Sequence, residues 1–336
     1  MFRNSLIRFL ALLVVAAGVV LGGSWFYYVE AVSKPFEFGE GTFVVARGET
    51  LNGISRRLTD SGITPEPWSL RILARQNGNK PIMAGEYDFP RTMALTEFLD
   101  RIVSGRGQVD VGVTIVEGWT FRMMREVLGT AEGLRPDTRE WSDDRIMEAL
   151  GYPDLHPEGQ FYPDTYYYRK GDPDLDIYRK AFELMQFRLR QVWAQRSPDL
   201  PLDDPYEALI VASIIEKETQ DRDEQPTIAG VLFNRLRKGM RLQTDPTVIY
   251  GVGDAFDGNI TRKHLKTDTP YNTYTRAGLT PTPISLPGMD SLMAAVRPAE
   301  TEAYYFVAKG GGRHHFSRTL EEHNRAVRKY ILGKKQ

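Results

Sequence analysis

The chain has 336 residues, of which 41% are hydrophobic and 26% are charged, and its formal net charge is −1. This length allows two modest domains beside a targeting segment, and the balanced charge gives no electrostatic basis for binding nucleic acid. Because the chain contains no cysteine, disulfide frameworks, zinc fingers and thiol nucleophiles are excluded.

The N-terminal segment is typical of a membrane anchor. Residues 9 to 29 carry no charge, and as a helix they would extend about 31 Å at roughly 1.5 Å per residue, which matches a bilayer core. Arg3 and Arg8 precede this run and the aromatic residues 25 to 28 close it, as expected for a cytoplasmic N-terminus and an aromatic belt at the far interface. A cleaved signal peptide is the alternative, but the aromatic residues after Ser24 offer no small-residue cleavage site. We therefore expect an uncleaved single-pass anchor, with the chain beyond residue 30 outside the cytoplasm.

Residues 30 to 112 predict a short linker, to about Gly41, and then a small α+β module. TFVVARGETLNGISRRL indicates a strand, a turn at Gly48 and an amphipathic helix. We expect a second helix from Glu66 to Arg75, a strand in AGEYDFP and a helix in LTEFLDRIVSG that ends at Gly105. The string R-G-E-T-L-x-x-I-x-x-x-L, which begins at Arg47, resembles the start of LysM modules, which bind peptidoglycan or chitin glycan. A support domain with no ligand of its own is the alternative.

Residues 113 to 336 predict a larger, mainly helical unit with short strands, so that the chain as a whole belongs to the α+β class. VTIVEGWTFRMMREVL indicates a strand that enters a helix, and residues 174 to 196 predict a long amphipathic helix. A further helix is expected from Pro226 to Lys238, and the glycines 310 to 312 indicate a tight turn between two strands.

The most informative segment is DPYEALIVASIIEKET, residues 204 to 219. Asp204 is a natural helix N-cap, Pro205 suits the first helical position, and Glu207 is placed to complete a capping box. The residues that follow are apolar on nearly every side of a helix, so we expect this helix to lie inside the domain.

Glu218 near the end of this helix is a candidate general acid. Apolar residues lie three, four and seven positions before it, and the negative end of the helix dipole opposes its ionisation. Both effects favour a carboxylic acid that stays protonated near neutral pH, as sugar-bond cleavage requires. The alternative is an ordinary ion pair with Arg222 or Lys217. The residues three and four positions before Glu216 are smaller and more polar than those before Glu218. This difference favours a structural ion pair or a substrate hydrogen bond for Glu216 over catalysis.

Several other polar and aromatic residues are candidates for binding sugars. Asp245 is a natural N-cap for a short helix over TVIY, but it and its two neighbours could also bind sugar hydroxyl or acetamide groups. Aromatic rings in a proline-flanked loop offer faces for sugar stacking. Adjacent histidines on a strand point to opposite faces and no metal-ligand spacing is present, so we expect no metal and no cofactor. The substrate-binding candidates are Glu216, Gln243, Thr244, Asp245, Tyr271, Asn272, Tyr274 and His314.

A family resemblance follows from strings that occur in order along the second unit: ASIIEKET, NRLRKGMRLQTDPTVIYG, PYNTYTRAGLTPTPIS, YYFVA and HFSRTLEEHN, with EGQFYPDTY before them. Together they resemble the endolytic murein transglycosylase (YceG-like) family over residues 113 to 332, and the anchor and LysM-like module match that family's architecture. The family takes the second glutamate of its E-K-E triplet as catalytic, so the resemblance implies Glu218. The family's loop usually reads closer to G-L-P-P, whereas this chain has Thr280 before Pro281.

Helix geometry favours a mechanism with a single acid. Glycoside hydrolases normally place two carboxylates beside the scissile bond, but Glu216 and Glu218 point about 200° apart on a helix, at roughly 100° per residue. We therefore expect Glu218 to act as acid and then as base, while the C6 hydroxyl of muramic acid attacks C1 and closes an anhydro ring. The alternatives are a hydrolase whose water is activated by Asp245 or Glu216, and a non-catalytic glycan-binding scaffold.

The resemblance also implies the setting of the protein. It implies a lyase of the inner membrane with an N-terminal anchor (residues 1 to 29), a linker and LysM-like module (30 to 112) and a periplasmic catalytic domain (113 to 336). Its expected partners are peptidoglycan glycan strands, the membrane itself and neighbouring cell-wall synthases.

Overall fold

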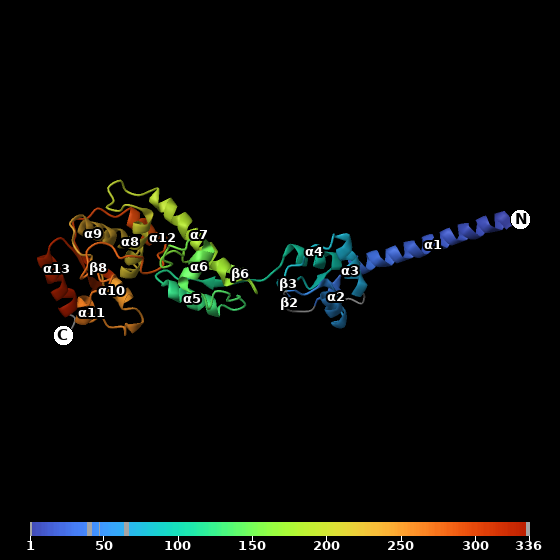
Figure 1. Cartoon of the computed structure of the whole chain (residues 1–336), viewed down its shortest axis with the longest axis horizontal. Coiled ribbons are helices and arrows are strands. Elements are labelled where there is room, and N and C mark those ends of the chain that lie inside the picture. Colours follow the sequence, from blue (N-terminus) through green and yellow to red (C-terminus); the bar gives the residue numbers. More distant parts are fainter. Residues whose placement is uncertain (1, 39–41, 47, 64–66, 334–336) are drawn as a thin grey trace. The chain divides into compact units, whose positions relative to one another are not determined.

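The computed structural model describes residues 2–38, 42–46, 48–63 and 67–333, which form two compact units (Figure 1). The first unit comprises residues 1–111 and 169–171, and the second comprises residues 112–168 and 172–336. Helices dominate both units, and within the described chain every sheet has only two strands. The predicted mixture of helices and strands is confirmed. Gly41, Arg47, Glu66 and the side chain of Arg3, which entered the predictions above, lie outside the described part.

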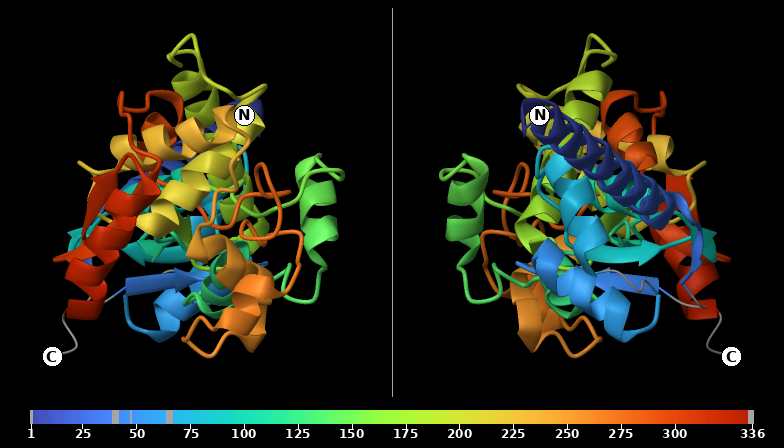
Figure 2. Two further views of the ribbon diagram at one scale, coloured as in Figure 1. Left: turned by 90° about the vertical axis from the view of Figure 1, so that its left-hand side faces the viewer. Right: turned by 90° about the vertical axis from the view of Figure 1, so that its right-hand side faces the viewer.

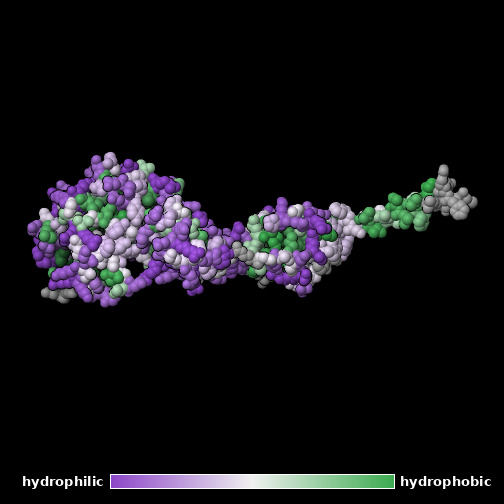
Figure 3. Space-filling model, viewed as in Figure 1, coloured by the Kyte–Doolittle hydropathy of each residue, from purple (hydrophilic) through white to green (hydrophobic). Residues whose placement is uncertain are grey.

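The first unit begins with α1 (Phe2–Ser33). Its stretch Ile7–Ser33 is long and apolar enough to cross a membrane, and apolar side chains cover its surface (Figure 3). The helix continues past the predicted end of the anchor, and Tyr28 and Val32 are buried in the core of the module that follows. The hydroxyl of Tyr28 donates to the side chain of Gln76 at 2.5 Å. Tyr28 therefore packs in the module, whereas the other residues of the predicted aromatic belt are exposed.

The rest of the first unit packs helices and short strands around one core. Its elements are β1 (Phe36–Glu37), β2 (Thr42–Val45), α2 (Leu51–Asp60), α3 (Pro67–Gln76), β3 (Gly85–Asp88), β4 (Thr92–Met93) and α4 (Leu95–Ser104). β1 pairs with β4 and β2 pairs with β3, both antiparallel. Ile54 and Leu58 from α2 and Phe98 from α4 are fully buried. The predicted strands and helices of this module are present, and the stretch predicted as a linker holds the end of α1 and β1 instead.

The second unit is mainly helical, as predicted. From β5 onward the elements are β5 (Asp110–Thr114), α5 (Phe121–Thr130), α6 (Asp143–Leu150), β6 (Thr165–Arg169), α7 (Asp174–Trp193), α8 (Pro205–Glu218), α9 (Gln225–Arg237), α10 (Asp245–Val252), the 3₁₀ turn η1 (Gly253–Ala255), α11 (Arg262–Lys266), α12 (Met289–Val296), β7 (Tyr305–Gly310), β8 (Arg313–Ser317), α13 (Leu320–Val327) and the π-helical turn η2 (Arg328–Leu332).

The helix α8 lies at the centre of this unit. It contacts α7, α9, α10 and α12, and its apolar side chains belong to the main core cluster. The β7–β8 hairpin and α13, drawn in red, lie along one flank of these helices (Figure 2). The hairpin turns through glycines 310 to 312, all of which have positive φ. This confirms the predicted glycine turn. Separately, Arg313 and His314 of β8 bond to Asp221 and Glu224 in the segment that follows α8.

Candidate active site

The candidate acid lies at the C-terminal end of α8, a helix whose middle is buried in the second unit. Asp204 accepts a hydrogen bond from the backbone N–H of Glu207 at 2.9 Å, as an N-cap does. The carboxylate of Glu207 accepts from the backbone N–H of Asp203 at 2.7 Å, one residue before the position that a capping box uses. Every residue from Ala208 to Ile215 is buried. The expected helix with apolar residues on all sides is therefore present.

Glu218 is the last residue of α8, and its side chain is half-buried. Burial and, to a smaller extent, the charge of Asp245 raise the pKa of its carboxyl group to about 8, and the charge of Arg235 opposes the increase. Desolvation disfavours the charged form of an acid, and a nearby negative charge acts in the same direction. Most molecules therefore carry a protonated Glu218 at neutral pH, which is the state that a general acid needs.

The two cations that could have formed an ion pair with Glu218 contact other groups instead. Arg222 pairs with Asp290 at 3.0 Å between Nε and Oδ2. The ammonium group of Lys217 donates to the carbonyl oxygen of Gly118 at 3.1 Å. The two cations considered for an ordinary ion pair with Glu218 are thus engaged elsewhere.

Glu216 has different surroundings from Glu218. Its Oε2 accepts from the backbone N–H of Gly288, the N-cap residue of α12, at 3.0 Å. Its charge also raises the pKa of Glu117, after the larger effect of burial on that group. The two acids of the E-K-E triplet therefore contact different parts of the fold, as their helical spacing requires. Glu216 has a structural hydrogen bond, and its contact with substrate stays a prediction.

Asp245 is the charged group that raises the pKa of Glu218, after the larger effect of burial, and its carboxylate contacts Tyr274. We refer to these two residues as the catalytic wall. The hydroxyl of Tyr274 donates to Oδ1 of Asp245 at 2.6 Å, and burial raises the pKa of Tyr274, so the phenol remains a donor. The expectation that Asp245 caps α10 is wrong. Thr244 occupies the N-cap position and Asp245 is the first helical residue. The carboxylate of Asp245 accepts the hydrogen bond of the tyrosine instead of capping the helix.

The two residues before Asp245 are fixed by hydrogen bonds of their backbone N–H groups to Thr273. Gln243 has a φ of +51°, in the left-handed region that residues other than glycine rarely adopt. Its backbone N–H donates to the carbonyl oxygen of Thr273 at 3.2 Å, and its side chain is exposed. Thr244 is only 1% exposed and its hydroxyl donates to that of Thr247 at 3.3 Å. Thr244 therefore has a structural role inside the site. Of the two residues, only Gln243 is accessible to solvent or substrate.

Of the three candidate residues in the loop from 269 to 279, Asn272 is buried, and Tyr271 and Tyr274 are partly buried. Asn272 is 1% exposed, its amide donates to the carbonyl oxygen of Thr267 at 2.7 Å, and its Oδ1 accepts from the backbone N–H of Tyr274 at 2.8 Å. Tyr271 is partly buried, with its hydroxyl 2.9 Å from that of Thr282. Asn272 therefore positions Tyr274, whereas Tyr271 keeps an accessible ring.

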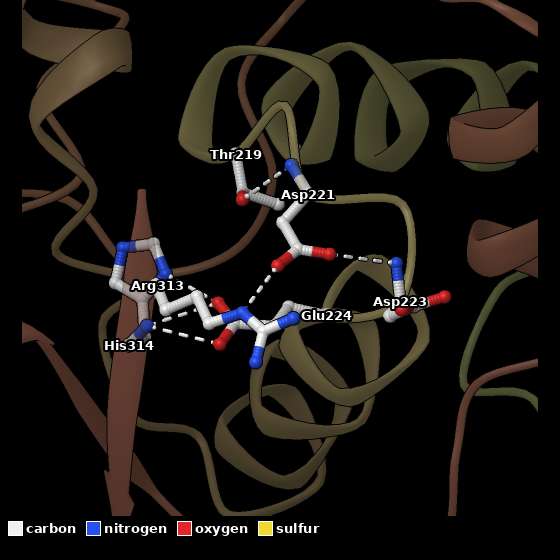
Figure 4. Close-up of polar contacts among 6 residues, drawn as sticks. All are labelled: Thr219, Asp221, Asp223, Glu224, Arg313 and His314. Carbon is white, nitrogen blue, oxygen red and sulfur yellow. Dashed lines mark hydrogen bonds and ion pairs between the residues drawn. The ribbon is translucent and has the colours of Figure 1, made fainter. Parts of the chain in front are cut away.

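The segment after α8 is tied to β8 by a polar network (Figure 4). The hydroxyl of Thr219 accepts from the backbone N–H of Asp221 at 3.0 Å, and the carboxylate of Asp221 pairs with Arg313 at 3.0 Å. The carboxylate of Glu224 accepts from the backbone N–H of His314 at 3.0 Å, and Nδ1 of the same histidine lies 2.9 Å from Oε2. His314 thus has a structural partner, and its contact with substrate stays a prediction.

The C-terminal histidines have separate partners. The ring of His315 lies 5.5 Å from that of Tyr330, and the ring of His323 stacks on Tyr305 at 5.3 Å. Among the residues that the structure describes, no group of three or more histidine and acidic side chains could hold a metal ion.

Arg235 is a functional candidate that the sequence reading missed. It is only 6% exposed, and it donates to the carbonyl oxygens of Leu242 and Tyr304, both at 2.6 Å. The signal that could have found it is its position on α9. Ile228 and Val231, seven and four residues before it on the same helix face, are both fully buried. A cation on the apolar face of a helix must find buried acceptors.

Comparison with known proteins shows the family to which the chain belongs. The YceG-like family profile matches residues 43–329. The endolytic murein transglycosylase of Bacillus subtilis is 29% identical over 95% of this chain and 93% of its own length. That of Streptococcus pneumoniae is 24% identical over 99% of this chain, which spans 66% of that relative. The crystal structure of a YceG-like protein from Listeria monocytogenes superposes with a TM-score of 0.55 at 28% identity, over 85% of this chain and 98% of the other. The chain therefore belongs to the YceG-like family.

Proposed function

We propose that this protein is a membrane-anchored lytic transglycosylase that cuts peptidoglycan strands internally, at the bond between N-acetylmuramic acid and N-acetylglucosamine. The observation that carries the proposal is the half-buried Glu218, whose pKa is raised to about 8 at the end of a buried helix. The reaction class and the substrate are supported by the relatives named endolytic murein transglycosylase.

In the proposed reaction Glu218 acts first as an acid and then as a base. Its proton goes to the glycosidic oxygen that leaves C1 of muramic acid, and the C1–O bond breaks with the electron pair on that oxygen. The carboxylate of Glu218 then takes the proton of the C6 hydroxyl, whose oxygen forms a new bond to C1. The product is a 1,6-anhydro ring, and Glu218 ends in its starting, protonated state. No water and no second carboxylate take part.

The surrounding residues divide between tuning the acid and binding sugars. Asp245 adds to the larger effect of burial in raising the pKa of Glu218, and Tyr274 fixes the carboxylate of Asp245. We assign the exposed side chain of Gln243 and the ring of Tyr271 to substrate contacts, because both are accessible beside this wall. Glu216, Thr244, Asn272 and His314 act in this account through the hydrogen bonds that hold the site.

The helix α1 would place this activity at the inner membrane. We propose a cytoplasmic N-terminus, an anchor that includes residues 1–29, and a periplasmic chain in which residues 30–112 form a LysM-like module and residues 113–336 the catalytic domain. Peptidoglycan strands are the proposed substrate of the catalytic domain, and cell-wall synthases are its proposed neighbours. The apolar stretch Ile7–Ser33 supports the anchor.

Hydrolysis is a second candidate reaction, because Asp245 lies close enough to raise the pKa of Glu218 and could activate a water. Digestion of purified glycan strands by the full chain in detergent micelles separates the two reactions. The full chain is needed because the buried Tyr28 would be lost from a form cut at residue 30. Anhydro ends in the mass spectrum support the transglycosylase, reducing ends support the hydrolase, and unchanged strands contradict both.

A further inference from the structure

The second unit contains a pocket of about 830 Å³ whose lining does not include Glu218. Its lining includes Phe121, Glu158, Tyr250, Phe256 and Tyr271. These residues come from α5, the segment before β6, the end of α10, the turn after it and the 269–279 loop.

The pocket shares two structural elements with the catalytic wall. The helix α10 begins at Asp245 beside Glu218 and reaches the pocket at Tyr250, five residues later, about 7.5 Å along the axis at roughly 1.5 Å per residue. The 269–279 loop supplies Tyr274 to Asp245 and Tyr271 to the pocket. The catalytic residues and the pocket therefore share one helix and one loop of the second unit.

Aromatic rings give this pocket the chemistry of a sugar site. The rings of Tyr250 and Tyr271 meet edge to face with centroids 4.8 Å apart, and Phe256 lines the pocket beside them. Aromatic side chains combine an apolar face with, for tyrosine, a polar tip. At the rim, Arg122 and Asp254 form an exposed ion pair of 2.6 Å that offers polar groups to sugar hydroxyls.

The aromatic rings are fixed before any ligand binds. Glu158 is only 4% exposed, and its two carboxylate oxygens accept from the backbone N–H of Phe121 at 2.9 Å and from the hydroxyl of Tyr250 at 3.1 Å. The hydroxyl of Tyr271 lies 2.9 Å from that of Thr282. Side chains that are already ordered lose little conformational entropy on binding.

We propose that this pocket is a remote saccharide subsite, which binds sugar rings of the same glycan strand whose scissile bond lies at Glu218. The proposal rests on the function proposed above and extends it. Tyr250, Tyr271 and Phe256 contact the sugar rings, and Glu158 holds the ring of Tyr250 in place. A site that binds the strand away from the bond that breaks favours cleavage inside long strands over cleavage at their ends.

The test measures binding separately from cleavage. The full chain with Glu218→Gln, in detergent micelles, is titrated calorimetrically with peptide-free glycan strands of two, four, six and eight sugars. We expect the affinity to rise with strand length. Tyr250→Ala or Phe256→Ala, added to this background, should weaken binding of the longest strand about tenfold, or ~1.4 kcal/mol, and leave the shortest strand unaffected. Tyr250→Phe, which keeps the ring, should retain most of the affinity.

The matched control is Tyr167→Ala, which removes an aromatic side chain that is 63% exposed on β6, outside the pocket lining. It should leave the affinity for all strands unchanged. An affinity that does not rise with length, or that Phe256→Ala and Tyr250→Ala leave unchanged for the longest strand, overturns the subsite. Binding of long strands that depends on Tyr250, together with no cleavage by the chain that retains Glu218, would instead contradict the proposed reaction alone.

Discussion

The hydroxyl of Tyr274 donates a 2.6 Å hydrogen bond to Oδ1 of Asp245, whose charge in turn raises the pKa of Glu218. Asn272 holds this tyrosine by accepting its backbone N–H. A loop far from α8 in the sequence therefore holds the charged group that, after burial, raises the pKa of the residue at the end of α8. This relationship leads to predictions about rate, pH dependence and stability.

The first prediction concerns the pH dependence of cleavage. Because Glu218 must be protonated to act as an acid, kcat/KM should fall as the pH rises through about 8. Asp245→Asn removes a charge that raises this pKa, so the alkaline limb should move to lower pH. Asp257→Asn, an exposed aspartate of the second unit, serves as the control and should keep the original profile. Equal alkaline limbs in the Asp245→Asn variant and the unchanged chain would contradict the role of Asp245.

A second prediction links Glu218 to stability. The folded-state pKa of about 8 lies above the ordinary value of 4.5, so the stability that the protonated form contributes is complete below pH 4.5 and is lost as the pH rises to 8. Glu218→Gln should therefore gain stability relative to the unchanged chain over this window, by about 3 kcal/mol at pH 8, given ~1.36 kcal/mol per pKa unit and some loss to partial exposure.

Urea unfolding at pH 4.5 and pH 8 measures this difference. Glu183→Gln changes an exposed acid on α7, and its stability relative to the unchanged chain should be the same at both pH values. A Glu218→Gln variant whose relative stability is also independent of pH would show that the carboxyl has an ordinary pKa in the folded protein.

Arg235 should matter for stability. Arg235→Met would leave the buried carbonyl oxygens of Leu242 and Tyr304 without their 2.6 Å donors, at a cost of about 3 kcal/mol in unfolding free energy. Arg190→Met, at an exposed position of α7, should change it by less than about 0.5 kcal/mol. Thermal unfolding of both variants compares them directly. Equal melting temperatures would mean that the carbonyl oxygens find other donors.

The network after α8 should act on catalysis by positioning Glu218. Glu224→Gln weakens its contacts with His314, which join this segment to β8. We expect kcat to fall about tenfold with little change in KM, because misplaced catalytic groups lose rate. The neighbouring Asp223→Asn changes an exposed side chain and should keep kcat. A Glu224→Gln variant with unchanged kcat would show that the hairpin does not position the acid.

The local features of the fold follow from the sequence because they depend on neighbours along the chain. The apolar positions around Glu218 predict a buried helix that ends in an acid, and that helix is α8. The glycines of the β7–β8 turn are predictable for the same reason, since their positive φ is a local requirement. Glu216 and Glu218 contact different surroundings because the helical spacing fixes their directions.

The groups that surround Glu218 are brought together by tertiary contacts, so the local sequence gives little sign of them. Tyr274 meets Asp245 across 29 residues of sequence, and His314 meets Glu224 across 90. Asp245 has the pattern of an N-cap, yet Thr244 takes that position, since either residue can precede a helix. The burial of Tyr28 in the module is not predictable locally, because a tyrosine suits a bilayer interface and a protein core alike.

The most direct test of the account compares the full chain with its Glu218→Gln and Glu216→Gln variants on purified glycan strands, with the new ends read by mass spectrometry. We predict anhydro-muramic acid ends from the unchanged chain, a loss of at least about a thousandfold in rate for Glu218→Gln, and retained cleavage for Glu216→Gln. Full cleavage by Glu218→Gln, or reducing ends in place of anhydro ends, would contradict the single-acid mechanism.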